Sequence, residues 1–273
     1  MGSVLSYSGL STKIRAMQSR LVTDEQLEEI VQLPNVPQVT AYLKRTPEYQ
    51  NIWSGLDEND LHRGQIEKLL KKSIFLNFSR LYHFANQEQR TFLSLYSKRY
   101  EIRVLKEIMT NLFDHRDTDP VDISPYRDFF RHHSKLDIDR LTACTNMDEF
   151  IAALKGNDFF IPLSQVNERG NATLFDFGMA LDLSYFSQIW NVRKKLFKGN
   201  DLKQITKAYG EKFDMLNLQF IQRSKRCFQM EPAAIYALLV PMTMGRRDPT
   251  AFMPLTCSRV ATPWRRYCGS TSS

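Results

Sequence analysis

Three polar side chains interrupt an apolar helix face late in the chain, and their residue types are the ones best suited to chemistry. Residues 201–210 predict a helix that ends at Gly210, and residues 211–230 predict a second helix. In that second helix Asp214, Asn217 and Lys225 fall within a wide apolar arc. Each of the three needs a partner, because an unpaired charge or polar group is costly to bury.

Asp214 has two interpretations. Placed in the first turn of the second predicted helix, its carboxylate is favoured by the helix dipole and the free N–H groups there. A catalytic carboxylate is one interpretation, but no nucleophile, metal-ligand cluster or phosphate-binding loop accompanies it. A structural polar network between packed helices is favoured, because buried polar groups are normally hydrogen-bonded. We therefore expect Asp214→Ala to lower the melting temperature of this part of the protein.

Two other motifs suggest chemistry only superficially. His115-Arg116-Asp117 spells the triplet of the protein-kinase catalytic loop, but no Gly-rich loop accompanies it. His132 and His133 are adjacent, so they point to different faces of a helix, and no third ligand lies at a spacing typical of zinc sites. The sequence has neither G-x-x-x-x-G-K-[ST] nor G-x-G-x-x-G. We therefore expect no catalytic residue, no metal, no cofactor and no small-molecule substrate.

Apolar periodicity predicts helix almost everywhere. A capping sequence at Thr23 opens one predicted helix, and Asn146 caps another. The long helical patterns cover residues 59–84, 87–111 and 174–197, and a loop is predicted at 165–171. The predicted fold class is all-α.

Three pairs of segments match in the same order at nearly constant spacing, which predicts an internal repeat. Residues 35–44 match 146–155, residues 78–82 match 186–190, and residues 100–108 match 213–221, with offsets of 108 to 113. In the last pair Glu101 takes the place of Asp214, and Val104 takes the place of Asn217. The sequence therefore predicts tandem related helical domains.

Composition limits the remaining possibilities. The chain of 273 residues carries a net charge of +7, of which residues 242–273 contribute +4. The rest is only mildly basic, which does not predict a nucleic-acid-binding face. No apolar run approaches the roughly 18 residues of a membrane span, and the N-terminus lacks a signal-peptide core. A reducing compartment is expected, because the four cysteines show no disulfide or metal framework: Cys144, Cys227, Cys257 and Cys268.

The polar residues of the predicted helix over 211–230 also carry a family resemblance. Asp214-Met-Leu-Asn-Leu218, followed by Ile221, Arg223 and Lys225, resembles the D-x-x-N-L…R-x-K helix of the C subunit of V-type ATP synthases, the counterpart of the d subunit of vacuolar ATPases. Tyr7 and the segment over 13–21 resemble the family's N-terminal Y…R-x-x-x-M-x-S-x-L helix. The resemblance covers residues 7–241 and implies a structural role for Asp214, Asn217, Arg223 and Lys225.

The family resemblance also implies an architecture of three related helical domains forming a funnel, of which two copies are recognisable here. We expect a first helical domain at 1–116, a linker at 117–125 and a second helical domain at 126–241. Residues 242–273 show no third copy, and we expect them to be a disordered tail.

The implied function is that of a non-catalytic central-stalk subunit of a rotary V/A-type ATPase. It would couple the central axle to the membrane rotor ring for proton or sodium transport. The expected partners are the axle subunits and the rotor-ring proteolipid, with no nucleic acid, on the cytoplasmic face of the membrane. Two alternatives are a helical-repeat scaffold that binds proteins outside any rotary ATPase and an enzyme with an unrecognised helical active site.

Overall fold

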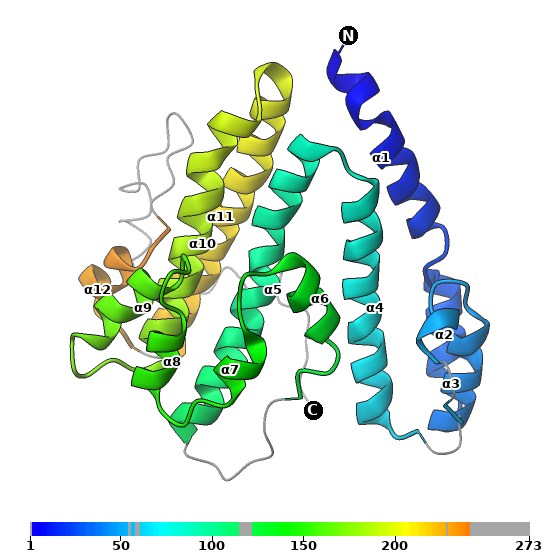
Figure 1. The fold of residues 1–273 in the computed structure, drawn as a ribbon, viewed down its shortest axis with the longest axis horizontal. Coiled ribbons are helices and arrows are strands. Elements are labelled where there is room, and N and C mark those ends of the chain that lie inside the picture. Colours follow the sequence, from blue (N-terminus) through cyan, green and yellow to red (C-terminus); the bar gives the residue numbers. More distant parts are fainter. Residues whose placement is uncertain (1, 54–55, 58–60, 115–121, 228, 241–273) are drawn as a thin grey trace. The chain divides into compact units, whose positions relative to one another are not determined.

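The protein is built from helices. A computed structural model describes residues 2–53, 56–57, 61–114, 122–227 and 229–240, and every regular element in these ranges is helical (Figure 1). The predicted all-α class is confirmed. Internal contacts divide the chain into two compact units, unit 1 (Met1–Gly178) and unit 2 (Met179–Ser273).

Most of the shorter helices lie in unit 1. That unit holds α1 (Gly2–Gln18), α2 (Asp24–Val31), α3 (Val36–Arg45), the 3-10 turn η1 (Gln50–Ile52), α4 (Arg63–Phe84), α5 (Gln87–Asp114), α6 (Arg127–His133), α7 (Ile138–Thr142), α8 (Met147–Ala153) and α9 (Phe160–Asn167). Helix α10 (Leu174–Leu196) begins in unit 1 and continues into unit 2, which also holds α11 (Gly199–Cys227) and α12 (Pro232–Ala237).

Local capping signals fix several of these helix starts. Thr23 and Gln26 form a reciprocal capping box at the start of α2, as predicted. Asn146 caps α8 by accepting a hydrogen bond of 2.9 Å from the Glu149 N–H. Asn35 caps α3 in the same way, with 3.0 Å to the Gln38 N–H. These starts follow from the sequence because each cap is made within one helical turn.

Aromatic rings of α4, α5 and α6 form the centre of unit 1. Phe75 and Phe78 of α4 lie 5.0 and 5.5 Å from the ring of Phe129 in α6, and Phe78 lies 6.4 Å from Tyr100 in α5. Phe75, Phe78 and Phe129 are all buried. Tilted and edge-to-face ring contacts of this kind add to the free energy of burial. The rings therefore stabilise the packing of the three helices.

Unit 2 is organised around the antiparallel pair α10 and α11, which Figure 1 shows side by side. Phe213 of α11 lies 5.0 Å from Phe186 and 5.9 Å from Trp190, both in α10. Phe197 and Lys198 join the two helices, and Gly199, the first residue of α11, adopts a positive φ of 54°.

The predicted helix stop at Gly210 is wrong. Helix α11 runs without a break from Gly199 to Cys227. Gly210 is buried inside the helix, and its φ is not positive, unlike that of Gly199. Tyr209 and Phe213, one turn apart, are both buried, and their rings lie 5.8 Å from each other. Their packing offsets the cost of a glycine inside a helix, about 1 kcal/mol.

Three further expectations have different outcomes. The loop predicted at 165–171 is helical up to Asn167, where α9 ends. Most of the predicted linker and all of the predicted disordered tail lie outside the described residues, so those boundaries stay predictions. Among the helices that the structure describes, none combines the length and the hydropathy needed to cross a membrane.

Candidate functional site

Helix α11 distributes the four predicted motif residues over different environments. Asn217 is buried, Asp214 and Lys225 are half-buried, and Arg223 is exposed. Neither Asp214 nor Lys225 is without a partner. Because α11 begins at Gly199, Asp214 lies deep inside the helix rather than in a first turn. The helix-dipole argument for its carboxylate therefore does not hold.

Asn217 makes a reciprocal pair of hydrogen bonds with the backbone of Val240. Its Nδ2 donates to the Val240 carbonyl oxygen at 3.2 Å, and its Oδ1 accepts from the Val240 N–H at 2.9 Å. Both residues are buried, with exposed fractions of 4% and 7%. The amide thus satisfies both main-chain groups of one residue and fastens the segment after α12 to the middle of α11.

The apolar residues beside this pair explain why the segment needs fastening. Ile235 of α12 and Leu239 pack with Ile221 of α11 in a small buried cluster. Helix α12 has only six residues, too few to be stable without tertiary contacts. Asn217 therefore supports α12 through hydrogen bonds while Ile221 supports it through apolar contact.

The segment of unit 1 that the predicted repeat aligns with α11 has no asparagine at the position of Asn217. At the position that corresponds to Asn217, α5 carries Val104, which is completely buried. Glu101 corresponds to Asp214 and is only 6% exposed, so desolvation raises the pKa of its carboxyl group, while the Ser134 hydrogen bond and the Lys98 charge oppose the rise. In the predicted alignment both helices therefore carry an acid at this position, but the valine of α5 cannot make the pair of amide hydrogen bonds that Asn217 makes in α11.

The described part of the chain contains no group of three or more His, Cys, Asp or Glu side chains arranged to hold a metal ion. His115-Arg116-Asp117 lies outside the described residues. A second kinase-like triplet, Asp176-Phe177-Gly178, begins in the first turn of α10. There the Asp176 carboxylate accepts hydrogen bonds from the Thr173 N–H at 2.8 Å and from its hydroxyl at 2.6 Å. These hydrogen bonds cap the start of α10, so the contacts of this carboxylate are structural.

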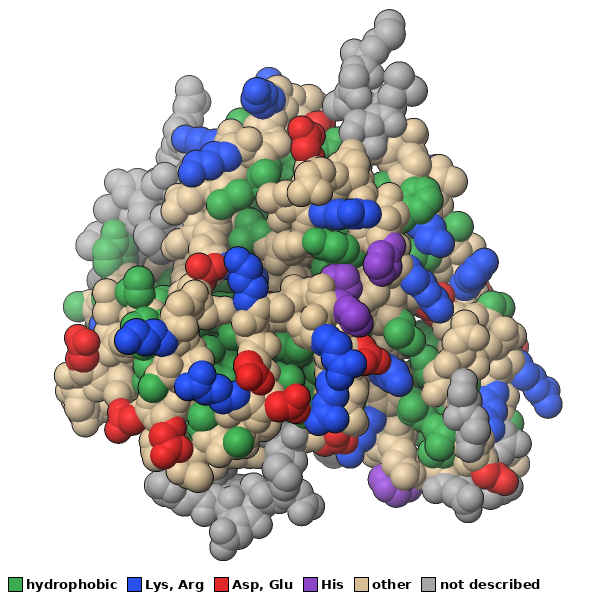
Figure 2. Space-filling model, viewed as in Figure 1, with side chains coloured by type: hydrophobic (Ala, Val, Ile, Leu, Met, Phe, Trp, Pro, Cys, Tyr) green, Lys and Arg blue, Asp and Glu red, His purple; other side chains and the backbone are tan. Residues whose placement is uncertain are grey.

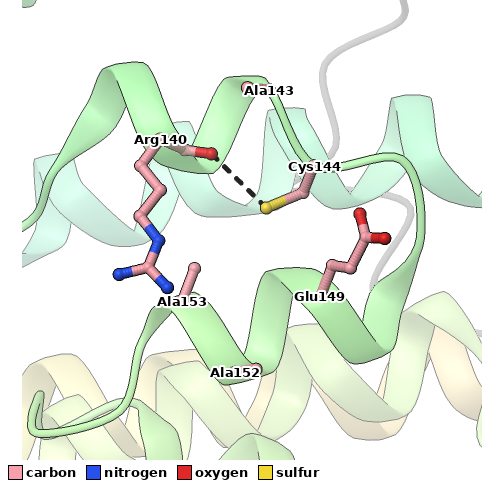
Figure 3. Close-up of a pocket in the computed structure, with 6 residues that line it drawn as sticks. All are labelled: Arg140, Ala143, Cys144, Glu149, Ala152 and Ala153. Carbon is pink, nitrogen blue, oxygen red and sulfur yellow. Dashed lines mark hydrogen bonds between the residues drawn. The ribbon is translucent and has the colours of Figure 1, made fainter.

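A shallow surface pocket of about 290 Å³ lies between α7 and α8 (Figure 3). Cys144 is its most reactive residue type, but its thiol donates to the Arg140 carbonyl oxygen at 3.4 Å. Burial and the nearby Glu149 carboxylate raise the pKa of that thiol, which disfavours a thiolate nucleophile. Glu149 in turn accepts from the Thr145 N–H and hydroxyl, both at 3.0 Å. The pocket therefore holds no activated group.

His133 is a half-buried basic group in unit 1. Its Nε2 lies 2.9 Å from the Ser79 hydroxyl, its ring packs 4.7 Å from Tyr82, and its Nδ1 is buried with no hydrogen-bond partner among the described residues. Desolvation lowers the pKa of His133 below 6.5, and the nearby His83 and His132 lower it further. The folded protein therefore favours the neutral ring.

We expect the stability of unit 1 to fall as the pH drops below about 6.5. In that range the unfolded chain takes up a proton at His133 before the folded chain does, so acid favours unfolding. Thermal melting between pH 7.5 and 5.5 measures the effect, and His133→Phe should flatten the pH dependence. His132→Gln, at an exposed site on the same helix, removes one of the two neighbouring charges and should retain most of the pH dependence, because desolvation is the largest cause of the shift. An unchanged pH dependence in His133→Phe would contradict this assignment.

A protein-family model described as the ATP synthase (C/AC39) subunit matches residues 10–252. The chain belongs to this family. The resemblance to the C subunit of V/A-type ATP synthases is thereby confirmed. Three curated relatives agree, each named as the C subunit of an A-type ATP synthase. The Methanobrevibacter smithii protein is 24% identical over 82% of this chain, the Methanosarcina mazei protein 22% over 86%, and the Methanococcoides burtonii protein 21% over 82%.

The chain spans 56%, 63% and 60% of the lengths of these three C/AC39 relatives, respectively. The family match includes all of α11, and so all four motif residues. Of the four, Asn217 is the residue for which the structure describes specific hydrogen bonds. The comparisons indicate no catalytic role. Sequence reasoning found Asn217 but missed Val240, because a backbone partner leaves no signature in residue type.

Proposed function

We propose that this chain is a non-catalytic central-stalk subunit of a rotary V/A-type ATPase. In this proposal it couples the central axle to the membrane rotor ring for proton or sodium transport. Its partners are the axle subunits and the rotor-ring proteolipid, and it lies on the cytoplasmic face of the membrane as a peripheral part of the complex. The family match over residues 10–252 is the observation that carries the proposal.

The helical pairs supply the stiffness that such a role requires. Helices α4, α5, α10 and α11 contain 22, 28, 23 and 29 residues, which corresponds to lengths of about 33–44 Å. Aromatic contacts join α4 to α5 and α10 to α11, so neither pair depends on a single helix to resist bending. A connector that passes torque needs this property more than it needs an active site.

We also propose that residues 1–116 and 126–241 are two copies of one helical domain. The aligned positions support this proposal through equivalent contacts. Phe78 and Tyr100 form a ring pair at 6.4 Å between α4 and α5, and their counterparts Phe186 and Phe213 form one at 5.0 Å between α10 and α11. The Asn35 and Asn146 caps, also aligned, make the same hydrogen bond at the starts of α3 and α8.

Recovery of partners from membranes tests the functional proposal. The tagged chain is expressed in its native host, membranes are solubilised in mild detergent, and co-purifying subunits are identified by mass spectrometry. We expect an axle subunit and the rotor-ring proteolipid to be recovered together. An untagged strain and an unrelated tagged helical protein control for background binding.

A fusion protein makes a negative result informative. Here the chain is fused to the part of the Methanobrevibacter smithii relative that lies outside its match to this chain. If only the fusion recovers the two partners, the stalk function stands but needs the added segment. If neither protein recovers either partner while both are folded by circular dichroism, the proposal is wrong, and a protein-binding scaffold outside rotary ATPases is the alternative to pursue.

A further inference from the structure

The turn between α10 and α11 carries a dense group of positive charges. Within residues 191–210 there are six basic residues and a single acidic residue, Asp201. Five of the six are exposed lysines, which we call the basic turn: Lys194, Lys195, Lys198, Lys203 and Lys207. Figure 2 shows Lys and Arg side chains gathered at this end of the hairpin. Of the five, only Lys207 has a described acidic partner, Glu211 at 3.9 Å.

The sixth positive charge, Arg193, is buried beneath the basic turn. It is only 8% exposed, and its guanidinium lies 3.4 Å from the centre of the Trp190 ring. Its Nε donates to the Thr206 hydroxyl at 3.2 Å, and its Nη1 donates to the Trp190 carbonyl oxygen. The bond to Thr206 joins the end of α10 to the start of α11. Both acceptors are neutral, and no carboxylate pairs with Arg193 among the described residues.

A buried cation is normally paired with an anion. Without a described counter-charge, the positive charge of Arg193 is uncompensated within the hairpin. Because Arg193 is not neutralised within the hairpin, its charge adds to the field of the four lysines that lack a described ion pair. Apolar surroundings such as the Trp190 ring screen this field less than water does. The turn is therefore a fixed positive surface. Contact with an external anionic surface would supply the counter-charge and stabilise these unpaired cations.

The chemistry of the basic turn favours a lipid surface over a protein carboxylate. Bidentate recognition of carboxylates uses exposed Arg side chains, but the single Arg of this stretch, Arg193, is buried and stacked. Only lysines reach solvent, and lysine is a flexible point charge that suits many phosphate headgroups at once. Half-buried Leu196, Phe197 and Leu202 lie between them, and this mixture of Lys with apolar residues is typical of interfacial segments.

We propose that the basic turn of the α10–α11 hairpin docks on anionic lipid headgroups at the membrane surface. The charge argument comes from unit 2 alone, and the proximity of a membrane rests on the proposed stalk function. Docking is reversible, because it depends on surface charge without insertion of a helix. It would hold the hairpin against the bilayer while the rest of the protein contacts its partners.

Vesicle binding by the purified full chain tests this proposal. Flotation with phosphatidylcholine vesicles that contain phosphatidylglycerol should recover the protein at low salt, whereas vesicles of phosphatidylcholine alone should not. High salt should release it, because exposed charges are screened. The test variant is Lys194→Gln/Lys195→Gln/Lys198→Gln. We expect about a fivefold loss of affinity per lysine, and so a combined loss of roughly 100-fold.

A charge-matched variant separates the basic turn from net charge. Lys71→Gln/Lys135→Gln/Lys155→Gln removes three exposed lysines from unit 1 and should retain most of the binding. Circular dichroism checks that both variants are folded. Equal losses in the two variants, binding to neutral vesicles, or undiminished binding by the turn variant would each overturn the proposal.

The same turn variant in the membrane pull-down distinguishes the two proposals. If the wild-type chain recovers stalk partners but binds no anionic vesicles, the function stands and the lipid proposal falls. If, in that same case, the turn variant recovers fewer stalk partners than the wild type, the basic turn contacts an acidic protein instead of lipid. If vesicle binding is lost in the turn variant alone but no partner is ever recovered, the lipid proposal stands and the stalk function falls.

Discussion

Replacing Arg80 by Met is expected to lower the free energy of unfolding of unit 1 by about 3 kcal/mol. Arg80 Nη1 lies 3.1 Å from Glu48 Oε1, and the Glu48 side chain is only 1% exposed. The second oxygen, Oε2, is buried without a hydrogen-bond partner among the described residues. Without Arg80 the Glu48 carboxylate would lose its cation, and an uncompensated buried charge is strongly destabilising.

Two further variants identify the cause of that loss. Arg63→Met removes the Arg63–Glu67 pair, whose side chains are 86% and 51% exposed, and should cost less than about 0.5 kcal/mol. Arg80→Met/Glu48→Met removes both charges and should recover much of the lost stability, because a buried ion pair is often no more stable than an apolar replacement. Urea unfolding measures all three. If the double variant were as unstable as Arg80→Met, lost packing rather than the unpaired carboxylate would be responsible.

Features that depend on a few neighbouring residues were predictable from the sequence. The Thr23 capping box and the Asn146 cap are complete within four residues, so residue type and spacing suffice to identify them. The long helices α4, α5 and α10 follow from apolar periodicity in the same way. The all-α class and the family resemblance both depend on such local patterns.

Features that depend on contacts distant in sequence were not predictable. Gly210 has the residue type of a helix stop, but the packing of Tyr209 and Phe213 carries α11 through it. The sequence placed Asn217 on an apolar face and required a partner for it. It could not indicate Val240, 23 residues away, because the partner is a main-chain group that every residue except proline offers in full.

The same distinction separates the candidate site residues. Asp214 and Asn217 look alike in the sequence, as polar residues within one apolar arc. In the structure only Asn217 is buried and has a defined pair of partners, because it faces the segment after α12, whereas Asp214 is half-buried. Asn217 is therefore the stronger candidate for a structural polar contact. The loss of stability on substitution of each residue can be compared in unit 2.

Replacing Asn217 by Ala is expected to destabilise unit 2 by about 3 kcal/mol. The substitution removes two hydrogen bonds and leaves the buried N–H and carbonyl groups of Val240 without partners. Desolvated groups left unsatisfied cost more than the bonds themselves contribute. Because Val240 follows Ile235 and Leu239, α12 should detach first, so hydrogen exchange of the α12 amides should rise before global unfolding.

Comparison along α11 separates loss of the Val240 bonds from the general effect of an alanine substitution in this helix. Gln219→Ala changes an exposed amide two residues away and should alter stability by no more than about 0.5 kcal/mol. Asp214→Ala should fall between the two, because Asp214 is half-buried and has a partner. Asn217→Asp retains an acceptor for the Val240 N–H but loses the donor to its carbonyl, so it should remain clearly destabilised. If Asn217→Ala matched Gln219→Ala in urea unfolding and in α12 exchange, the Asn217–Val240 pair would not be what holds α12 in place.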